Sequence, residues 1–182
     1  FTGAIWLCGM IGTTSQAANQ IALSLASLTF MFAMGLSVTA MIRIGNQKGL
    51  NDYVTLRKVA ISIFLLAIVI EIVFALLFVA LHTTLPYIFV DINDVTNLTE
   101  NLEVIAISAN LLLVAAVFQI SDGLQVVVLG ALRGLQDAKI PMYITFVAYW
   151  VIGFPISIYL GLETELKAGG VWIGLLAGLT AA

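Results

Sequence analysis

The stretch VAISIFLLAIVIEIVFALLFVAL, residues 59–81, decides the fold class of this chain. Within it only Ser62 and Glu71 are not hydrophobic. About 20 apolar residues are enough for a helix to cross the hydrocarbon core of a bilayer. Because a backbone in lipid must satisfy its own hydrogen bonds, a stretch of this kind is expected to be helical. Residues 59–81 therefore predict a membrane-spanning helix.

The composition of the whole chain also indicates a membrane environment. Its 182 residues are 62% hydrophobic and 9% charged, with a mean hydropathy of +1.12. Soluble domains carry about a quarter charged residues, so the bilayer is the environment that this chain fits. A net charge of -3 and a pI near 4.9 argue against nucleic acid as a partner. The single cysteine, Cys8, excludes an intrachain disulfide framework.

Hydropathy predicts an all-α, polytopic membrane protein with one transmembrane domain over residues 1–182. The six predicted spans are 1–11, 17–42, 59–81, 104–132, 140–162 and 169–182. The first and last are shorter than a bilayer crossing, so we expect them to be truncated helices in a piece of a longer protein. Residues 12–16 are predicted to form a tight turn, and Pro155 is predicted to kink the fifth span.

The charges of the connections predict the orientation of the spans. Connection 43–58 carries Arg43, Lys48, Arg57 and Lys58, and connection 133–139 carries Arg133 and Lys139. Connection 83–103, by contrast, holds the acids Asp91, Asp94, Glu100 and Glu103 and no Lys or Arg. The positive-inside rule therefore places connections 43–58 and 133–139 in the cytoplasm.

Small residues in two spans predict close helix packing. Ala and Ser residues recur through 17–42, and Gly123, Gly130 and Gly134 lie in or just beyond 104–132. In lipid, small side chains allow helix backbones to approach one another and to form interhelical hydrogen bonds.

Two carboxylates lie inside predicted spans, where an aspartate costs roughly 3 kcal/mol to insert. At 100° per residue, Gln119, Asp122 and Gln125 fall within about 120° of arc, and Ser108 joins that face about three turns before Gln119. A polar stripe around an acid is typical of a water-lined cavity or a cation site, so Asp122 is predicted to take part in transport. Glu71 is a possible secondary acid, for its neighbours at 67, 68, 74, 75 and 78 are all apolar. We therefore expect Glu71 to be protonated or paired with a polar group on another helix, and to serve packing rather than transport.

Two long stretches resemble a known family. AANQIALSLASLTFMFAMGLSVTAMIRIGNQKG (17–49) is similar to the eighth helix of multidrug and toxic compound extrusion (MATE) transporters. FQISDGLQVVVLGALRGLQDAKIPMYITFVAYWVIGFP (118–155) resembles their tenth and eleventh helices. The resemblance covers nearly the whole chain as the C-terminal lobe of a NorM-like member. Asn19 departs from the family pattern, in which histidine commonly precedes the glutamine.

The resemblance implies a twelve-helix exporter with two six-helix lobes that alternates between inward-facing and outward-facing states. It implies antiport in the bacterial inner membrane, in which Na⁺ or H⁺ enters as cationic organic compounds leave, with no cofactor besides the coupling ion. Asp122 matches the family's tenth-helix aspartate, which is assigned to cation coupling and would contact Na⁺ in a sodium-coupled member. The family's second acid, in the seventh helix, would precede Phe1, and the N-terminal lobe would lie outside this chain.

Three other functions remain to be weighed. A lipid-linked oligosaccharide or peptidoglycan-precursor flippase of the same superfamily usually carries basic residues in its cavity, and the predicted spans contain no Lys or Arg. A membrane enzyme would need clustered catalytic groups, whereas His82 has only Thr83 and Thr84 beside it, so no enzymatic activity is expected. A structural membrane subunit gives no reason for the stripe around Asp122.

Overall fold

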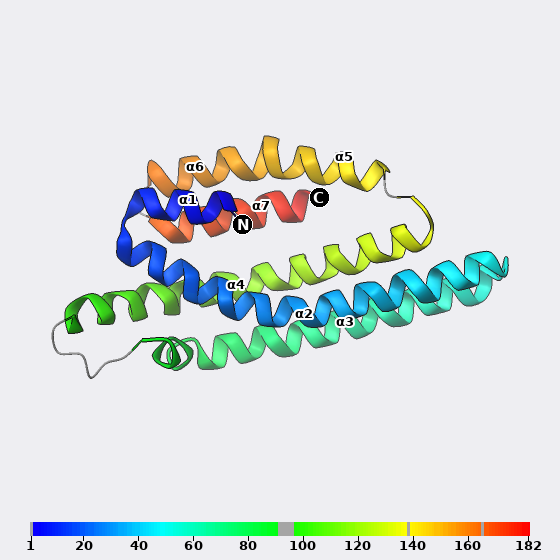
Figure 1. The fold of residues 1–182 in the computed structure, drawn as a ribbon, viewed down its shortest axis with the longest axis horizontal. Coiled ribbons are helices and arrows are strands. Elements are labelled where there is room, and N and C mark those ends of the chain that lie inside the picture. Colours follow the sequence, from blue (N-terminus) through cyan, green and yellow to red (C-terminus); the bar gives the residue numbers. More distant parts are fainter. Residues whose placement is uncertain (1, 91–96, 138, 165) are drawn as a thin grey trace.

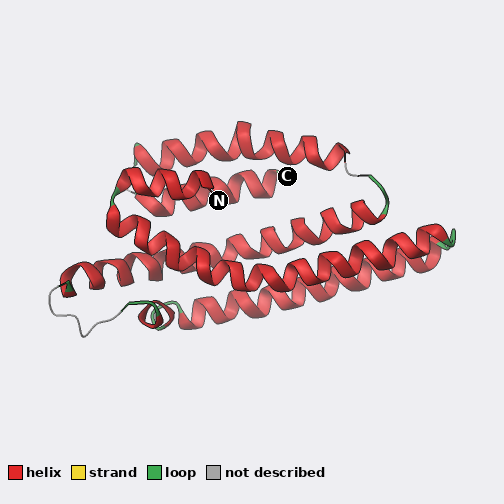
Figure 2. Cartoon of the chain, viewed as in Figure 1, coloured by secondary structure: helices red, strands yellow, loops and turns green. Residues whose placement is uncertain are grey.

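The computed structural model describes residues 2–90, 97–137, 139–164 and 166–182, and every regular element within them is helical (Figures 1 and 2). The elements are α1 (Thr2–Ile11), α2 (Thr13–Gly49), α3 (Tyr53–Leu81), the 3-10 turn η1 (Leu85–Ile88), α4 (Leu98–Gly134), α5 (Lys139–Val147), the π-helical segment η2 (Ala148–Gly153), α6 (Phe154–Leu162) and α7 (Lys167–Ala181). The all-α prediction is confirmed. Within the described ranges, α2, α3, α4 and the continuous run Lys139–Leu162 are long and apolar enough to cross a membrane.

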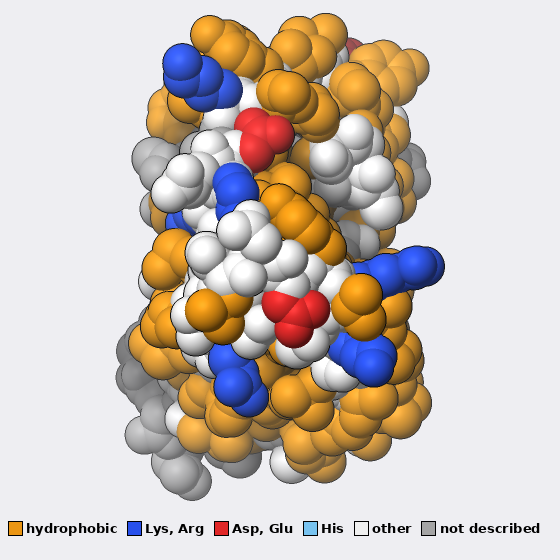
Figure 3. Space-filling view, turned by 90° about the vertical axis from the view of Figure 1, so that its right-hand side faces the viewer, with side chains coloured by type: hydrophobic (Ala, Val, Ile, Leu, Met, Phe, Trp, Pro, Cys, Tyr) orange, Lys and Arg blue, Asp and Glu red, His pale blue; other side chains and the backbone are white. Residues whose placement is uncertain are grey.

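The helices run back and forth along one long axis, and their connections alternate between the two ends (Figure 1). The α2–α3 and α4–α5 connections lie at one end, which Figure 3 views head-on with its blue Lys and Arg side chains. Lys48 of α2 donates a hydrogen bond to the carbonyl of Leu135, which ties these two basic connections together. The α3–α4 and α6–α7 connections lie at the opposite end. The chain thus segregates its basic connections by end, and the assignment of that end to the cytoplasm stays a prediction.

The long helices extend beyond the predicted spans. Connection 43–58 is wrong as a loop, because only residues 50–52 interrupt the helices there. The turn predicted at 12–16 is also wrong beyond Gly12: α2 begins at Thr13, and only Gly12, with φ 154°, breaks the run. The reason is that hydropathy detects the hydrocarbon crossing, whereas helical hydrogen bonding continues into polar residues at each end. At the start of α3, for example, Asp52 accepts a hydrogen bond from the Thr55 backbone at 3.0 Å. Hydrogen bonding to the Thr55 side chain, and then this backbone bond, lowers the pKa of Asp52.

Small residues bring α2 and α4 into direct backbone contact, as predicted. A Cβ added at Gly130 would collide with the backbone of Ser37, and one added at Gly134 would lie 2.6 Å from the Met41 carbonyl oxygen. The Ser37 hydroxyl donates to the carbonyl of Val126 at 2.8 Å, so a hydrogen bond joins the two helices. These contacts fix α2 against α4 along the half of α4 that follows Asp122.

A second glycine-lined contact joins α6 to α7. Gly174 lies against Ser157, whose hydroxyl donates to the Val171 carbonyl at 3.1 Å. The neighbouring Trp172 is 0% exposed, and its indole N–H donates to Asn19 of α2 at 2.9 Å. The Trp172 ring also meets Phe118 of α4 edge-on, with 5.3 Å between ring centroids. One tryptophan therefore connects three helices in the largest buried cluster.

The fifth predicted span contains a π-helical segment immediately before Pro155. Proline lacks the N–H that would bond to the carbonyl of Val151 in a regular α-helix. The π-helical segment η2 lies just before this position, and α6 begins after it at Phe154. The run nevertheless continues without a gap from α5 to α6 (Figure 1).

Candidate functional site

Asp122 lies in the interior of α4 and lines a small cavity that α2, α3 and α4 enclose. It is 9% exposed, and Gln119, one turn earlier on the same helix, is 3% exposed. The cavity is lined by Ala26, Thr29, Phe30, Glu71, Phe118, Gln119, Asp122 and Gly123. An ionisable group and an amide thus share a mostly apolar enclosure between three helices.

Glu71 reaches this cavity from α3, and it is 2% exposed. Its carboxylate lies directly over Gly123, because a Cβ added at that glycine would overlap the Oε1 and Cδ atoms of Glu71. Asp122 of α4 lines the same small cavity. The structure therefore brings together the two acids that the sequence had assigned to different roles.

Several polar atoms around the acids have no hydrogen-bond partner within the described part of the chain. They are the Oε2 atom of Glu71 and both side-chain polar atoms of Gln119. Buried polar groups in folded proteins are satisfied in the large majority of cases, and each exception costs about 1 to 3 kcal/mol. Three buried polar atoms near Asp122 are therefore left without a hydrogen bond to the described part of the protein.

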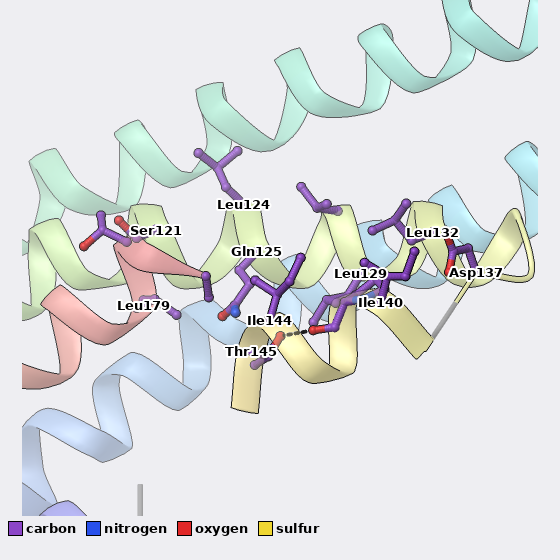
Figure 4. A pocket seen from close by; sticks show the side chains of 14 residues that line it. Ser121, Leu124, Gln125, Leu129, Leu132, Asp137, Ile140, Ile144, Thr145 and Leu179 are labelled. Carbon is purple, nitrogen blue, oxygen red and sulfur yellow. Dashed lines mark hydrogen bonds between the residues drawn. The ribbon is translucent and has the colours of Figure 1, made fainter. Parts of the chain in front are cut away.

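Gln125, the third member of the predicted stripe, faces a different neighbour. Its Oε1 accepts a hydrogen bond from the Tyr149 hydroxyl of η2 at 3.0 Å. It lines a larger, mainly apolar pocket between α4, α5 and the end of α7, where Ile144, Thr145 and Leu179 lie near it (Figure 4). The predicted polar face is thus divided, with Gln119 and Asp122 toward α3 and Gln125 toward α5.

Ser108 is buried and its hydroxyl has no partner, but it does not line the cavity of Asp122. Fourteen residues separate the two positions on α4, which corresponds to about 21 Å along the helix axis. Among the described residues no group of three or more His, Cys, Asp or Glu side chains is arranged to hold a metal ion. The oxygen atoms of Asp122, Glu71 and Gln119, which line the cavity, are of the type that a hard cation prefers.

Sequence reasoning allowed Glu71 a polar partner on another helix but did not identify Asp122 as that partner, because the pattern along one helix shows only the neighbours on that helix. The available signal was Gly123, a residue without a side chain immediately after the acid in α4. It also missed the pairing of Gln125 with Tyr149 and of Asn19 with Trp172. These pairs join distant parts of the chain, so no local pattern marks them.

Comparison with known proteins places this chain in a family. The MatE family model matches residues 2–159. A protein named "Probable multidrug resistance protein NorM" from Agrobacterium fabrum is 38% identical over 182 residues, which is 100% of this chain and 38% of that protein. Its namesake from Rhodopseudomonas palustris is 41% identical over 166 residues, or 91% of this chain and 34% of that protein.

A solved structure agrees on the fold. The crystal structure of the eukaryotic MATE transporter AtDTX14 matches with a TM-score of 0.80 at 20% identity, covering 91% of this chain and 35% of that one. This chain therefore spans less than two fifths of the length of these relatives. With a family match over most of its residues and the fold of a solved MATE transporter, the chain belongs to the MatE family.

Proposed function

We propose that this chain forms the C-terminal lobe of a cation-coupled multidrug antiporter in the bacterial inner membrane. Na⁺ or H⁺ binds at Asp122 as a cationic organic compound leaves, and the protein alternates between inward-facing and outward-facing states. An N-terminal lobe of the same protein completes the transport pathway. The family match and the printed names of the bacterial relatives support export of small organic molecules.

The observation that carries this proposal is a buried carboxylate that has no Lys or Arg partner among the residues that the structure describes. No described Lys or Arg forms an ion pair with Asp122, and the basic side chains of the chain lie at the helix ends. An aspartate at mid-span costs roughly 3 kcal/mol. That cost is offset when a proton or a small cation neutralises the group, so an acid of this kind is suited to exchanging one cation for another.

The pocket of Figure 4 supports a separate place for the organic compound. Most of its lining is apolar, and Gln125 and Thr145 supply polar atoms. Ligand sites of this type surround an apolar body and orient it with a few polar groups. The described residues of the Asp122 cavity include no Lys or Arg, which gives a flippase for anionic lipid-linked sugars less support.

The test is Asp122→Asn in the full-length protein, reconstituted into proteoliposomes with Na⁺ and pH gradients imposed separately. The substitution keeps the size and polarity of the side chain and removes its charge. We expect the wild type to respond to at least one gradient and the variant to export no faster than protein-free vesicles. Glu103→Gln, an exposed acid near the start of the same helix, is the matched control and should export like the wild type. Gradient-driven export by Asp122→Asn would refute the proposal.

A further inference from the structure

We propose that Glu71 is a second carboxylate that this chain contributes to the Asp122 site, and that the two acids, with the Gln119 amide, hold one monovalent cation between α3 and α4. The cation is Na⁺ or a proton shared by the two carboxylates. This inference rests on the proposed function, because it completes the same site with a residue from another helix.

The first support is geometric. Glu71 and Asp122 line one cavity, although they come from different helices. Gly123 makes the approach possible, since any side chain there would occupy the position of the Glu71 carboxylate. A glutamate that served packing alone would not require an empty position on the facing helix beside another acid.

The second support is the set of unsatisfied atoms. The Oε2 atom of Glu71 and the Oε1 and Nε2 atoms of Gln119 are buried, and none of them has a hydrogen-bond partner among the described residues. Glu71 and Gln119 are both more than nine-tenths buried. Carboxylate and amide oxygens are the ligands that hard cations take, so a cation in this cavity would satisfy oxygens that the protein leaves unpaired.

The third support is the charge of the pair. Two carboxylates that share a cavity of low polarity do not both carry a free negative charge, because their repulsion adds to the cost of desolvation. One positive charge between them removes the repulsion. If the pair holds a proton, binding of Na⁺ releases that proton, and the net charge of the site stays the same. The site then carries one cation at a time, as an exchanger requires.

The experiment measures the cation dependence of export by the full-length protein in proteoliposomes. The cation concentration that gives half-maximal export is determined with Na⁺ at fixed pH, and separately with a pH gradient in the absence of Na⁺. The variants are Glu71→Gln, Asp122→Asn and the control Glu103→Gln. We expect Glu71→Gln to raise the half-maximal concentration of the driving cation at least about tenfold, because it loses one of two anionic ligands. The arm in which this rise appears identifies the cation.

The possible outcomes separate this inference from the proposed function. If Asp122→Asn is inactive while Glu71→Gln has the same cation dependence as Glu103→Gln, the shared site is refuted and the proposed function stands. If Asp122→Asn exports normally, the proposed function itself fails. Size-exclusion chromatography of each variant in detergent shows whether it has folded.

A second variant tests the geometry with both acids present. Gly123→Ala places a methyl group where the Glu71 carboxylate lies, and that carboxylate is the mobile end of a side chain, so the helices can keep their packing while Glu71 turns away. Gly35→Ala on α2 is the matched control, since nothing lies within 4 Å of its added Cβ. We expect Gly123→Ala, but not Gly35→Ala, to raise the half-maximal cation concentration in the same direction as Glu71→Gln. Unchanged cation dependence in Gly123→Ala would overturn the inference.

Discussion

Replacement of Gly130 by alanine should weaken the contact between α2 and α4 by an amount that the structure allows us to estimate. The added Cβ would collide with the backbone of Ser37, and a backbone cannot turn aside as a side chain can. Overpacking of this kind costs about 1 to 3 kcal/mol. The resulting shift would also strain the hydrogen bond from Ser37 to Val126, and such bonds in membranes are worth about 0.6 kcal/mol on average. We therefore expect the contact between α2 and α4 to lose about 2 to 4 kcal/mol of stabilisation.

The matched control is Gly35→Ala, which makes the same chemical change in a membrane helix at a position with open space. Alanine favours a helix over glycine by about 1 kcal/mol at either site, so the difference between the two variants isolates the packing cost. The assay is the unfolding free energy of the purified protein in mixed micelles as the denaturing detergent fraction rises. Equal stability of Gly130→Ala and Gly35→Ala would show that the α2–α4 contact does not depend on the missing side chain.

Three other outcomes can be checked independently. A cysteine introduced at Asn46 should react with a membrane-impermeant reagent only from the cytoplasmic side, and one introduced at Thr99 only from the outside. The native Cys8 is buried, so its own labelling should be weak. The opposite pattern would show that the predicted orientation is inverted. Trp172→Phe should lower the free energy of unfolding by about 1 to 3 kcal/mol, because Asn19 loses its hydrogen-bond donor. Asn19→Leu added to that variant should recover part of this free energy. If it recovers none, the effect of Trp172→Phe comes from packing alone. Neutralising all four acids of the connection, Asp91, Asp94, Glu100 and Glu103, should change export far less than Asp122→Asn and only at low salt; Asp91 and Asp94 lie outside the described residues. The reason is that exposed charges are screened within about 8 to 10 Å at physiological ionic strength. A complete loss of export would place the essential acid in that connection.

The fold could be predicted from the sequence because one requirement dominates it, that a backbone in lipid satisfies its own hydrogen bonds. Runs such as 59–81 have no stable state in lipid other than a helix, so their number and order follow from hydropathy alone. The helix ends could not be predicted in the same way. Residues 43–49 and 53–58 are helical although they carry four of the seven Lys and Arg side chains of the sequence, because the helix of each neighbouring span continues past the apolar region.

The candidate site could be predicted only in part. An aspartate inside an apolar span, with glutamines on the same helix face, is visible in a sequence, and Asp122 was found on that basis. The position of Glu71 depends on how α3 is rotated against α4, and that rotation is set by contacts between helices rather than by the neighbours of Glu71 along the chain. For the same reason Gln125 could be placed on the face of Asp122 but not assigned to Tyr149.

The π-helical segment η2 has a consequence for the face that the fifth helix presents to its neighbours. Thr145 lines the pocket beside α4, and Ser157, twelve residues later, bonds to α7. In an uninterrupted α-helix these side chains would lie about 120° apart around the axis. A single π turn takes up one extra residue and leaves roughly 20° between them, so both point inward. The phase of α6 is therefore set by a residue count: one residue gained or lost within 148–153 would rotate all of α6 by about 100° and turn Ser157 away from Val171.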